Sequence, residues 1–236
     1  MDALLLSAGI GSRLKPFTEK WPKCLMPIRG IPLIEFWIQN LINAGVNRIF
    51  INTHHLSECV KEFIKHNKNK NKIKLLYEKQ LLGTAGTIEN IITKIDNIDK
   101  LIVVHSDNLF DGNIKEFINA HSNRPSEALM SLISFKTDRP DKSGILRFDQ
   151  NNLVREFHEK SQNYHGHIAN GAVYILEQEI LNWIKVNKPK DFSNEVIPNF
   201  IKRIFAWHFK GFYMDIGDLN SLKKAQEINI NKIKSQ

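Results

Sequence analysis

The chain has 236 residues, 42% of them hydrophobic, which is enough for one α/β domain or at most two small domains. It holds no run of 18 apolar residues and no charged-then-apolar leader, so we expect a soluble, cytoplasmic protein without a membrane partner. Two cysteines exclude a disulfide framework, and the net charge of +8 comes largely from a Lys/Asn-rich stretch that lacks the aromatic and arginine residues of a nucleic-acid-binding face.

The first half of the chain alternates between predicted strands and helices. Gly45 is placed to stop the first helix, and Ser57 is placed to cap the second. Apolar runs predict strands at 3–6, 48–53, 72–77 and 101–104, and apolar residues at helical spacing predict helices at 33–42, 57–65 and 84–95. This alternation is typical of a mostly parallel sheet with helices on both faces.

Past residue 125 the pattern changes to longer strands. A polar turn at 149–152 predicts a hairpin, and Asp218 is expected to cap a C-terminal helix. The predicted strands are 128–135, 144–148, 153–158, 168–176 and 204–213, and the predicted helices lie near 177–185 and 194–201. No repeat or linker divides the chain. We therefore predict a single domain over residues 1–236, a three-layer α/β/α Rossmann-like fold with a mostly parallel mixed sheet.

Small residues and two cations follow the first predicted strand. The loop Ser7-Ala8-Gly9-Ile10-Gly11-Ser12-Arg13 lets the backbone approach a ligand closely, and its successive N–H groups form an anion-binding concavity. Lys23 follows, held between two prolines. The loop is not a Walker loop, because no Gly-Lys-Ser/Thr follows, and it lacks the third glycine of a dinucleotide fingerprint. The strand, the loop and the cations together predict a polyphosphate site.

This stretch closely resembles the signature of the sugar-1-phosphate nucleotidyltransferases. The matched positions are Gly9, Gly11, Arg13, Leu14, Pro16, Thr18, Pro22, Lys23, Leu25, Pro27 and Ile28. The resemblance extends from Asp2 to about Ala225 and leaves no further domain of the kind some relatives carry, so one reaction is expected. It implies an enzyme of EC 2.7.7 type with a nucleotide-binding part at about 1–125 and a sugar-phosphate-binding part at about 126–228.

The resemblance implies that the nucleotide is held by the loop and by a second glycine-bearing segment. Gly83 and Gly86 bracket a helix start, where backbone amides point outward with a positive dipole. This segment resembles the family's Leu-Gly-Thr-Ala-Gly, which lines the nucleobase. Arg13 and Lys23 are the expected catalytic residues, on the β/γ-phosphates and the α-phosphate. The expected nucleotide-binding residues are Leu6, Ala8, Gly9, Gly11, Ser12, Glu78, Gly83 and Thr84.

Glu78 bears on the identity of the base. Guanine offers two adjacent donors, and an ionised carboxylate only accepts, whereas uracil and thymine present a donor flanked by acceptors that suits an amide. Family members specific for those pyrimidines resemble one another in having Gln here, and several guanylyltransferases have Glu. We therefore expect GTP. A solvent-facing Glu78 without a role is the alternative.

Two aspartates are candidate metal ligands. Asp107 lies in the segment His105-Ser106-Asp107-Asn108, which directly follows a predicted buried strand, and a carboxylate at such a strand end beside a phosphate site suits magnesium. The resemblance places the family's metal-binding aspartates at Asp107 and Asp215, so Mg²⁺ is the expected cofactor. Either aspartate alone would more often be a helix cap or turn residue, and the two in family register form the candidate pair. The histidines, His54-His55 included, lack zinc-ligand spacing and read as ordinary loop residues.

The resemblance also implies a sugar-phosphate site. Its residues are Gly144, Glu159, Lys160 and Asn170, with Lys160 reaching the sugar phosphate. Their alternative roles are a turn glycine, a surface ion pair and a strand bulge. The expected partners are the NTP and the sugar 1-phosphate, and the protein is expected to be a monomer or a homodimer.

The implied reaction joins an NTP and a sugar 1-phosphate into an NDP-sugar and pyrophosphate, for surface polysaccharide synthesis. The attacking phosphate oxygen is already anionic, so the reaction needs positioning and charge neutralisation but no general base. Within the class, a uridylyl- or cytidylyltransferase is the alternative. Outside it stand a non-catalytic nucleotide-sugar-binding protein and a glycosyltransferase of similar fold, neither of which releases pyrophosphate.

Overall fold

The computed structural model describes residues 1–160 and 166–228, and they form two compact units that interleave along the chain. The unit that we call the signature unit contains Asp2–Leu81, Val104–Ile114 and residues 211–228. The unit that we call the hairpin unit contains Leu82–Val103 and the described residues of Lys115–Lys210. Each unit therefore combines segments that are distant in sequence. The expected division into two substrate-binding parts near residue 125 stays a prediction.

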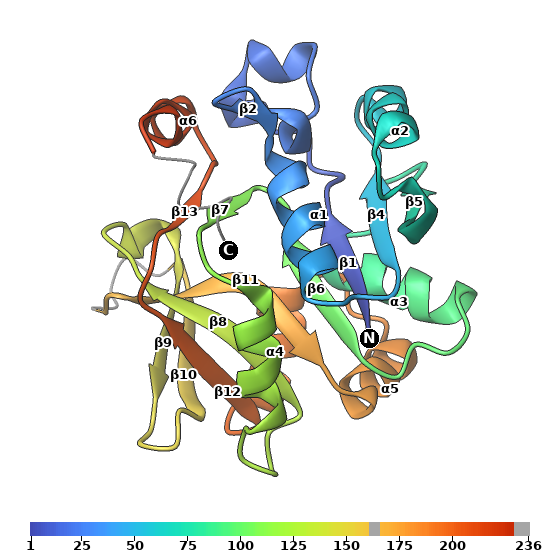
Figure 1. Ribbon diagram of the computed structural model, residues 1–236. Helices are drawn as coiled ribbons and strands as arrows, with labels where there is room; N and C mark the ends of the chain where they lie inside the picture. The colour runs from blue at the N-terminus through green and yellow to red at the C-terminus, as the bar shows by residue number, and fades with distance from the viewer. Residues whose placement is uncertain (161–165, 229–236) are drawn as a thin grey trace. The chain divides into compact units, whose positions relative to one another are not determined.

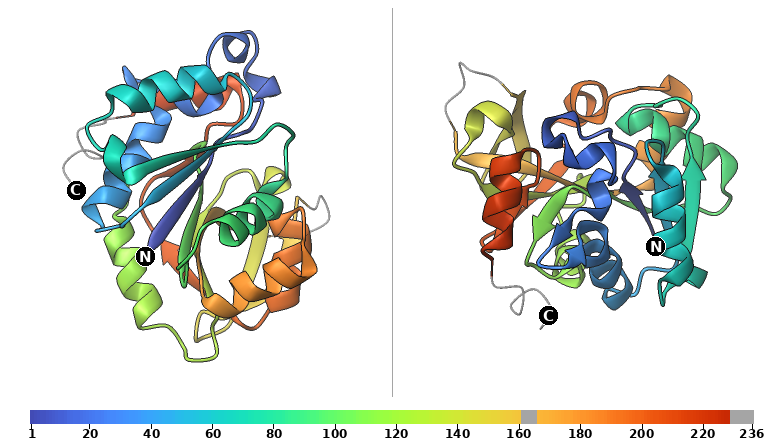
Figure 2. Two further views of the ribbon diagram at one scale, coloured as in Figure 1. Left: turned by 90° about the vertical axis from the view of Figure 1, so that its right-hand side faces the viewer. Right: turned by 90° about the horizontal axis from the view of Figure 1, so that it is seen from above.

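The signature unit is built on three parallel strands, drawn as neighbouring blue to teal arrows in Figure 2 (left). The strands are β1 (Asp2–Leu6), β4 (Ile49–Thr53) and β5 (Ile73–Tyr77), with β4 paired to both others. Every residue of β4 is buried, as are the first four of β1. Such burial on both faces explains why these segments read as continuous apolar runs.

Two helices carry the chain between these strands (Figure 1). They are α1 (Leu33–Asn43), which buries Trp37 and ends just before Gly45 as expected, and α2 (Ser57–His66). Gly45 has φ 80°, a backbone conformation that glycine adopts without strain. The predicted cap of the second helix is wrong. Leu56 holds the N-cap position and Ser57 is already helical, with no side-chain capping bond.

A small antiparallel pair joins two distant segments of the signature unit. β7 (Asn108–Phe110) pairs with β13 (Tyr213–Asp215). α6 (Leu219–Gln226) follows, and Asp218 caps it through a reciprocal bond pair with Ser221, which confirms the predicted cap. β2 (Pro27–Ile28) and β3 (Ile31–Pro32) form a short hairpin that contacts α6. A shared apolar cluster holds these pieces together: Ile28, Leu33, Leu109, Ile216 and Ala225.

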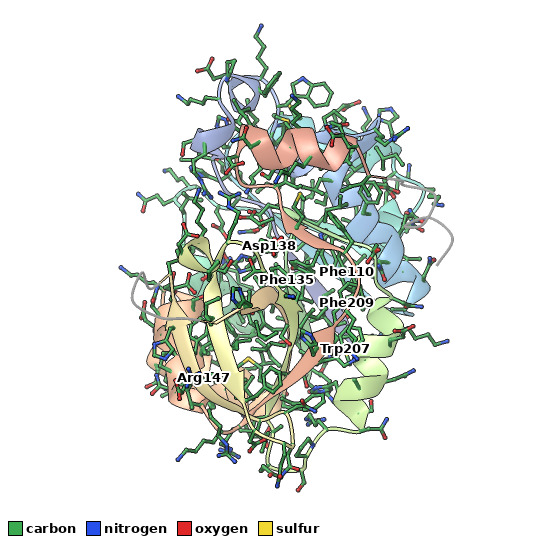
Figure 3. All side chains as sticks on the ribbon, turned by 90° about the vertical axis from the view of Figure 1, so that its left-hand side faces the viewer. Phe110, Phe135, Asp138, Arg147, Trp207 and Phe209 are labelled. Carbon is green, nitrogen blue, oxygen red and sulfur yellow. The ribbon has the colours of Figure 1, made fainter. Side chains whose placement is uncertain are left out.

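The hairpin unit holds the strands of the second half of the chain. The strands are β8 (Met130–Lys136), β9 (Gly144–Phe148), β10 (Val154–Glu159), β11 (Ile168–Leu176) and β12 (Ile204–Phe209). The predicted hairpin is confirmed, because β9 and β10 pair in antiparallel fashion. β8 pairs antiparallel with β11 and parallel with β12. On β12, Trp207 lies 5.8 Å from Phe209 between ring centroids (Figure 3) and 5.6 Å from Phe117.

The expected single strand at 204–213 is wrong. Its first part is β12, which pairs with β8, and its end belongs to β13, which pairs with β7. Lys210 and Gly211 interrupt the apolar residues of this stretch, and the chain leaves β12 there before β13 begins.

Three helices belong largely to the hairpin unit: α3 (Thr84–Lys94), α4 (Ile114–Ser122) and α5 (Gln178–Asn187). The sequence did not predict α4. The helix expected at 194–201 is replaced by a π-helical turn, Phe192–Val196, followed by a 3₁₀ turn, Ile197–Phe200. The pyrrolidine ring of Pro198 lacks the N–H that a regular α-helix would use there.

β6 (Leu101–His105) begins in the hairpin unit and ends in the signature unit. Parallel and antiparallel strands with flanking helices confirm the α/β class and the mixed, Rossmann-like sheet expected from the sequence. Within the described part of the chain, no helix has both the length and the apolarity to cross a membrane.

Candidate active site

The predicted phosphate loop begins where β1 ends, at Ser7. The Ser7 backbone N–H donates to Asn52 Oδ1 at 2.7 Å, and the Ser7 hydroxyl lies 2.8 Å from the hydroxyl of Ser106. Ser106 directly follows β6 and in turn donates to the Leu6 carbonyl at 2.8 Å. The start of the loop is therefore fixed at the carboxyl ends of β1, β4 and β6, where ligands bind in open α/β sheets.

Gly11 brings the middle of the loop against the rest of the signature. Its φ of 69° is left-handed, and a Cβ there would lie 2.9 Å from Thr18 Cγ2 and 3.2 Å from Lys23 Cβ. The Thr18 hydroxyl donates to the Gly11 carbonyl at 2.9 Å. Any other residue at position 11 would push Thr18 and Lys23 away from the loop. Ala8, Gly9 and Ser12 flank this turn in the same loop.

Lys23 lies between the two predicted metal ligands. Its Nζ is 2.5 Å from Asp107 Oδ2 and 3.9 Å from Asp215 Oδ1, and its side chain is only 12% exposed. Asp107 follows β6 and Asp215 ends β13. The Ile216 N–H donates to the Asp107 carbonyl at 2.9 Å. The two aspartates, more than a hundred residues apart, are thus brought together by the β7–β13 pairing.

Arg13 approaches the same group from the loop side. A Cβ on Gly217 would lie 2.8 Å from Asp215 Oδ2 and 3.2 Å from Arg13 Nη2, so Gly217 leaves the space in which these two side chains meet. Both expected catalytic cations and both expected metal ligands therefore gather at one place in the signature unit.

The two carboxylates differ in their electrostatic environment. Burial disfavours the charge of Asp107, but the positive charges of Lys23 and His105 outweigh burial and lower the pKa of Asp107 below its usual value. Burial and the neighbouring Asp107 raise the pKa of Asp215, and Lys23 and Arg13 offset this rise only in part. Asp107 is therefore the more firmly ionised of the two.

This donor set suits a magnesium ion that is shared with a substrate. Mg²⁺ prefers oxygen ligands and usually takes one or two carboxylates, with phosphates and waters completing the shell. No group of three or more His, Cys, Asp and Glu side chains is placed to hold a metal among the residues that the structure describes. Two carboxylates beside a phosphate loop match a shared ion, not a fully enclosed structural one.

Glu78 is buried, with 4% of its surface exposed, so the alternative of a solvent-facing residue is wrong. Its Oε1 accepts from Asn52 Nδ2 at 2.9 Å, and its backbone N–H donates to the Thr53 carbonyl at 2.8 Å. Since Asn52 also binds Ser7, a single amide connects Glu78 to the phosphate loop. The predicted contact of Glu78 with a base stays a prediction.

The second glycine-bearing segment lies in the hairpin unit. Gly83 precedes α3 with φ 83°, and a Cβ on it would collide with the Lys190 carbonyl oxygen. Thr84 Oγ1 accepts from the Phe192 N–H at 2.8 Å. Both expected nucleotide-binding residues are therefore held in place by the segment that follows α5.

The four expected sugar-phosphate residues come together within the hairpin unit. Gly144 pairs with Glu159 across β9 and β10, and a Cβ on it would lie 2.6 Å from Glu159 Oε2. Lys160 Nζ lies 3.2 Å from Glu159 Oε1, so the ion pair that was the alternative role of these two residues is present. Asn170 is on β11, next to Ala169, which pairs with Ile145 of β9.

A bulge distinguishes the surroundings of Asn170. The register of β11 shifts between Asn170 and Tyr174, and Ala172 within this stretch has φ 52°. Asn170 Nδ2 donates to the Tyr174 hydroxyl at 2.7 Å, and its Oδ1 accepts from the Ala172 N–H at 2.9 Å. The bulge expected as an alternative is therefore present, and it fixes the Asn170 amide.

The sequence reasoning missed the polar residues at the end of β4. Asn52 contacts Ser7 and Glu78, His54 Nδ1 lies 2.8 Å from the Glu78 carbonyl, and His55 Nε2 lies 2.8 Å from the Thr18 carbonyl. Their position at the carboxyl end of a predicted parallel strand was the available signal. One ring nitrogen of each of these two histidines is therefore paired with a backbone carbonyl.

Comparison with known proteins assigns the chain to one protein family. The family model described as nucleotidyl transferase matches residues 2–232. The mannose-1-phosphate guanylyltransferase catalytic subunit beta of Drosophila melanogaster is 29% identical over 220 residues, which are 91% of this chain and 59% of that protein. The mannose-1-phosphate guanyltransferase of Saccharomyces cerevisiae is 30% identical over 246 residues, 96% of this chain and 67% of that protein. The chain thus spans about three fifths of the length of several curated relatives that it matches.

Solved structures agree in fold. A Bacillus anthracis protein assigned as a glucose-1-phosphate thymidylyltransferase superposes with a TM-score of 0.85 at 22% identity, covering 99% of both chains. HddC from Yersinia pseudotuberculosis, solved with GMP-PN, superposes with a TM-score of 0.78 at 26% identity, covering 96% of this chain and 98% of that one. The signature's resemblance to the sugar-1-phosphate nucleotidyltransferases is thereby confirmed, and the chain belongs to the nucleotidyl transferase family.

Proposed function

We propose that the protein transfers a nucleotidyl group, from GTP by preference, to a sugar 1-phosphate, with release of pyrophosphate. The observation that carries this proposal is the convergence of Asp107 and Asp215 on Lys23, beside the Gly11 turn. A cation and two carboxylates next to a loop of small residues can hold a polyphosphate and its metal ion.

In this reaction a phosphate oxygen of the sugar 1-phosphate attacks the α-phosphorus of the nucleotide. A new P–O bond forms, and the bond from the α-phosphorus to the oxygen bridging it to the β-phosphate breaks, so pyrophosphate leaves with that electron pair. The nucleophile is already anionic, so the protein's task is to align the reactants and neutralise their charge. Lys23 would hold the α-phosphate, and Arg13 would hold the departing β- and γ-phosphates.

Asp107 and Asp215 would hold the Mg²⁺ ion. When bound, such an ion supplies positive charge to the phosphate oxygens and orients them for in-line displacement. The firmly ionised Asp107 suits the role of permanent ligand. The pKa of Asp215 is raised by burial and by the neighbouring Asp107, so a bound cation would stabilise its ionised form.

The hairpin unit would supply the acceptor's contacts. The Lys160 ammonium would bind the sugar phosphate, and the Glu159 carboxylate and the Asn170 amide would bind sugar hydroxyls. Gly144 would let the sugar approach the backbone, since any side chain there would meet Glu159. Gly83 and Thr84 would contact the nucleotide at the start of α3.

Two observations support GTP as the donor. Glu78 is a buried carboxylate held by an amide donor, which suits the paired N–H donors of guanine. The curated relatives named above are guanylyltransferases, and HddC was solved with a guanine nucleotide analogue. A mannose or heptose 1-phosphate is accordingly the proposed acceptor, in the synthesis of surface polysaccharide.

The test is pyrophosphate release in the presence of Mg²⁺, with GTP, UTP, CTP, ATP and dTTP crossed against a panel of sugar 1-phosphates. Release that requires GTP and a mannose or heptose 1-phosphate supports the whole proposal. Release with another nucleotide keeps the reaction and rejects guanine as its base. No release with any pair rejects the reaction, and GTP titration then asks whether the protein only binds nucleotides.

A further inference from the structure

The segment Asn52-Thr53-His54-His55, which we call the β4 end segment, has contacts that the proposed reaction does not explain. Asn52 is 3% exposed, and it uses both ends of its amide. Its Oδ1 accepts from the Ser7 N–H at 2.7 Å, and its Nδ2 donates to Glu78 Oε1 at 2.9 Å. One rigid planar group therefore joins the first residue of the phosphate loop to the proposed base-contacting residue.

The neighbours of Asn52 hold the backbone of Glu78. The Thr53 carbonyl accepts from the Glu78 N–H at 2.8 Å, and His54 Nδ1 lies 2.8 Å from the Glu78 carbonyl. The parallel register explains this arrangement, because Thr53 pairs with Tyr77 and the next residues along both strands lie side by side. Glu78 is thus held at its side chain, its N–H and its carbonyl by three consecutive residues.

The last residue of the β4 end segment contacts the signature itself. His55 Nε2 lies 2.8 Å from the Thr18 carbonyl, and Thr18 bonds back to Gly11. The same short segment therefore contacts the loop at Ser7, the signature at Thr18 and the Glu78 carboxylate. Three segments that are distant from one another in the sequence therefore form hydrogen bonds to the end of one strand.

We infer that Asn52 is a positioning residue that holds the Glu78 carboxylate in a fixed relation to the phosphate loop and thereby sets the base preference of the reaction. This inference rests on the proposed function. An amide is the side chain that supplies an acceptor for Ser7 and a donor for Glu78 in one plane. Aspartate would keep the acceptor but would place a second carboxylate against Glu78, and like charges at this distance repel in a buried site.

The chain contains a matched control for this substitution. Asn67 is 8% exposed, its Oδ1 accepts from the Asn69 N–H at 2.9 Å, and its Nδ2 donates to Glu35 Oε2 at 2.6 Å. Asn67 thus repeats the hydrogen bonding of Asn52 in the same unit, but it follows α2 and contacts Glu35 of α1 instead of Ser7 and Glu78. Asn67→Asp should lose the same kind of hydrogen bond without changing the base preference of the reaction.

The experiment compares wild type, Asn52→Asp and Asn67→Asp by pyrophosphate release and by the rise in Tm that GTP or UTP produces. For Asn52→Asp we expect kcat/KM with GTP to fall roughly tenfold or more, mainly through KM, because a bond to a charged group is lost. The ratio of kcat/KM for GTP to that for UTP should fall with it. Asn67→Asp should lower Tm comparably and leave that ratio at the wild-type value.

A double variant tests whether the two side chains act as a pair. In Asn52→Asp/Glu78→Gln the donor and acceptor are exchanged, so the hydrogen bond between the positions can form again. We expect a higher Tm than for Asn52→Asp alone, with the base preference of Glu78→Gln. A double variant no more stable than Asn52→Asp, or an additive loss of stability, would overturn the direct pairing.

The remaining outcomes separate the inference from the proposed function. An unchanged GTP/UTP ratio in an active Asn52→Asp, or an equal change in Asn67→Asp, overturns the inference and leaves the reaction standing. A wild type that releases no pyrophosphate overturns the reaction, and the inference is then judged on the nucleotide-induced rise in Tm. If GTP produces no such rise in the wild type, both are overturned.

Discussion

Lys23 Nζ lies 2.5 Å from a carboxylate oxygen of Asp107 and 3.9 Å from one of Asp215, so one ammonium group is shared by two acidic side chains. The three residues come from the signature, the end of β6 and β13, and they are placed by a short strand pair and by the Gly11 turn. A partly buried cation between two carboxylates lowers their mutual repulsion. In the proposed reaction, the Lys23 ammonium would bind a phosphate group while Asp107 and Asp215 hold the metal ion.

Replacing Lys23 by alanine should abolish most of the catalysis. Because the proposed reaction depends on neutralising charge at the α-phosphate, we expect kcat to fall by at least about 100-fold. Circular dichroism should show an intact fold, since Lys23 is not part of the apolar core. Lys15→Ala, which removes an exposed lysine of the neighbouring turn, is the control. Near-normal turnover by Lys23→Ala would refute the mechanism.

The two aspartates should control the requirement for metal. In Asp107→Asn and in Asp215→Asn, the Mg²⁺ concentration that gives half-maximal pyrophosphate release should rise by at least about tenfold. Removal of divalent cations with a chelator should stop the wild-type reaction, and added Mg²⁺ should restore it. Asp149→Asn, which changes a carboxylate of the β9–β10 turn, should leave this concentration unchanged. An identical Mg²⁺ dependence in all three variants would exclude the two aspartates as ligands.

Much of the fold follows from local sequence signals. β1 and β4 are buried on both faces, so their apolar runs are unmistakable, and the Asp218 cap follows from a capping side chain directly before a helix. β7 and β13 have three residues each, which is too short for any periodic pattern. The cap of α2 was assigned one residue too late, because the N-cap Leu56 adopts a left-handed conformation that a leucine does not signal.

The candidate site was predictable to the extent that it lies in contiguous motifs. The phosphate loop and Lys23 are visible in one stretch of sequence, and the pairing of Asp107 with Asp215 came from family resemblance. The role of Asn52 was not visible, because its contact with Glu78 depends on the register between β4 and β5. The apolar pattern of two strands predicts that they pair, but it does not by itself identify which residues lie opposite one another.

The two cysteines should differ sharply in reactivity. Cys24 is 2% exposed, and burial raises the pKa of its thiol to about 12, so little thiolate is present at neutral pH. Cys59 is exposed on α2, at the edge of an apolar cavity of about 770 Å³ lined by Trp21 and Phe63. A thiol reagent such as dithionitrobenzoate should therefore modify one thiol per native chain and two in denaturant. In Cys59→Ser the native protein should not react, and rapid modification of that variant would contradict the burial of Cys24.

A buried polar cluster in the hairpin unit should make stability depend on pH. His121 is fully buried, its Nδ1 lies 2.7 Å from the Ser131 hydroxyl, and its Nε2 lies 2.9 Å from Glu177 Oε1. The same Glu177 oxygen accepts from Lys100 at 2.8 Å and from Arg124 at 2.5 Å. Burial, with the positive charge of Arg124, lowers the pKa of His121 from 6.5 to about 4 and outweighs the opposing effect of Glu177.

The sign of the pH effect follows from proton binding in the two states. Between pH 6.5 and 4 the unfolded chain binds a proton at His121 and the native protein does not, so the free energy of unfolding falls as the pH falls through this range. The full loss attributable to this histidine is about 3 kcal/mol. The loss of stability is measured by urea unfolding at pH 7, 5.5 and 4 in the wild type and in His121→Gln. The glutamine keeps a donor for Glu177 but cannot titrate. The wild type should lose more stability than His121→Gln, whereas His66→Gln, at an exposed position on α2, should follow the wild type. Parallel losses in wild type and His121→Gln would show that His121 is protonated in the native protein as readily as in the unfolded chain.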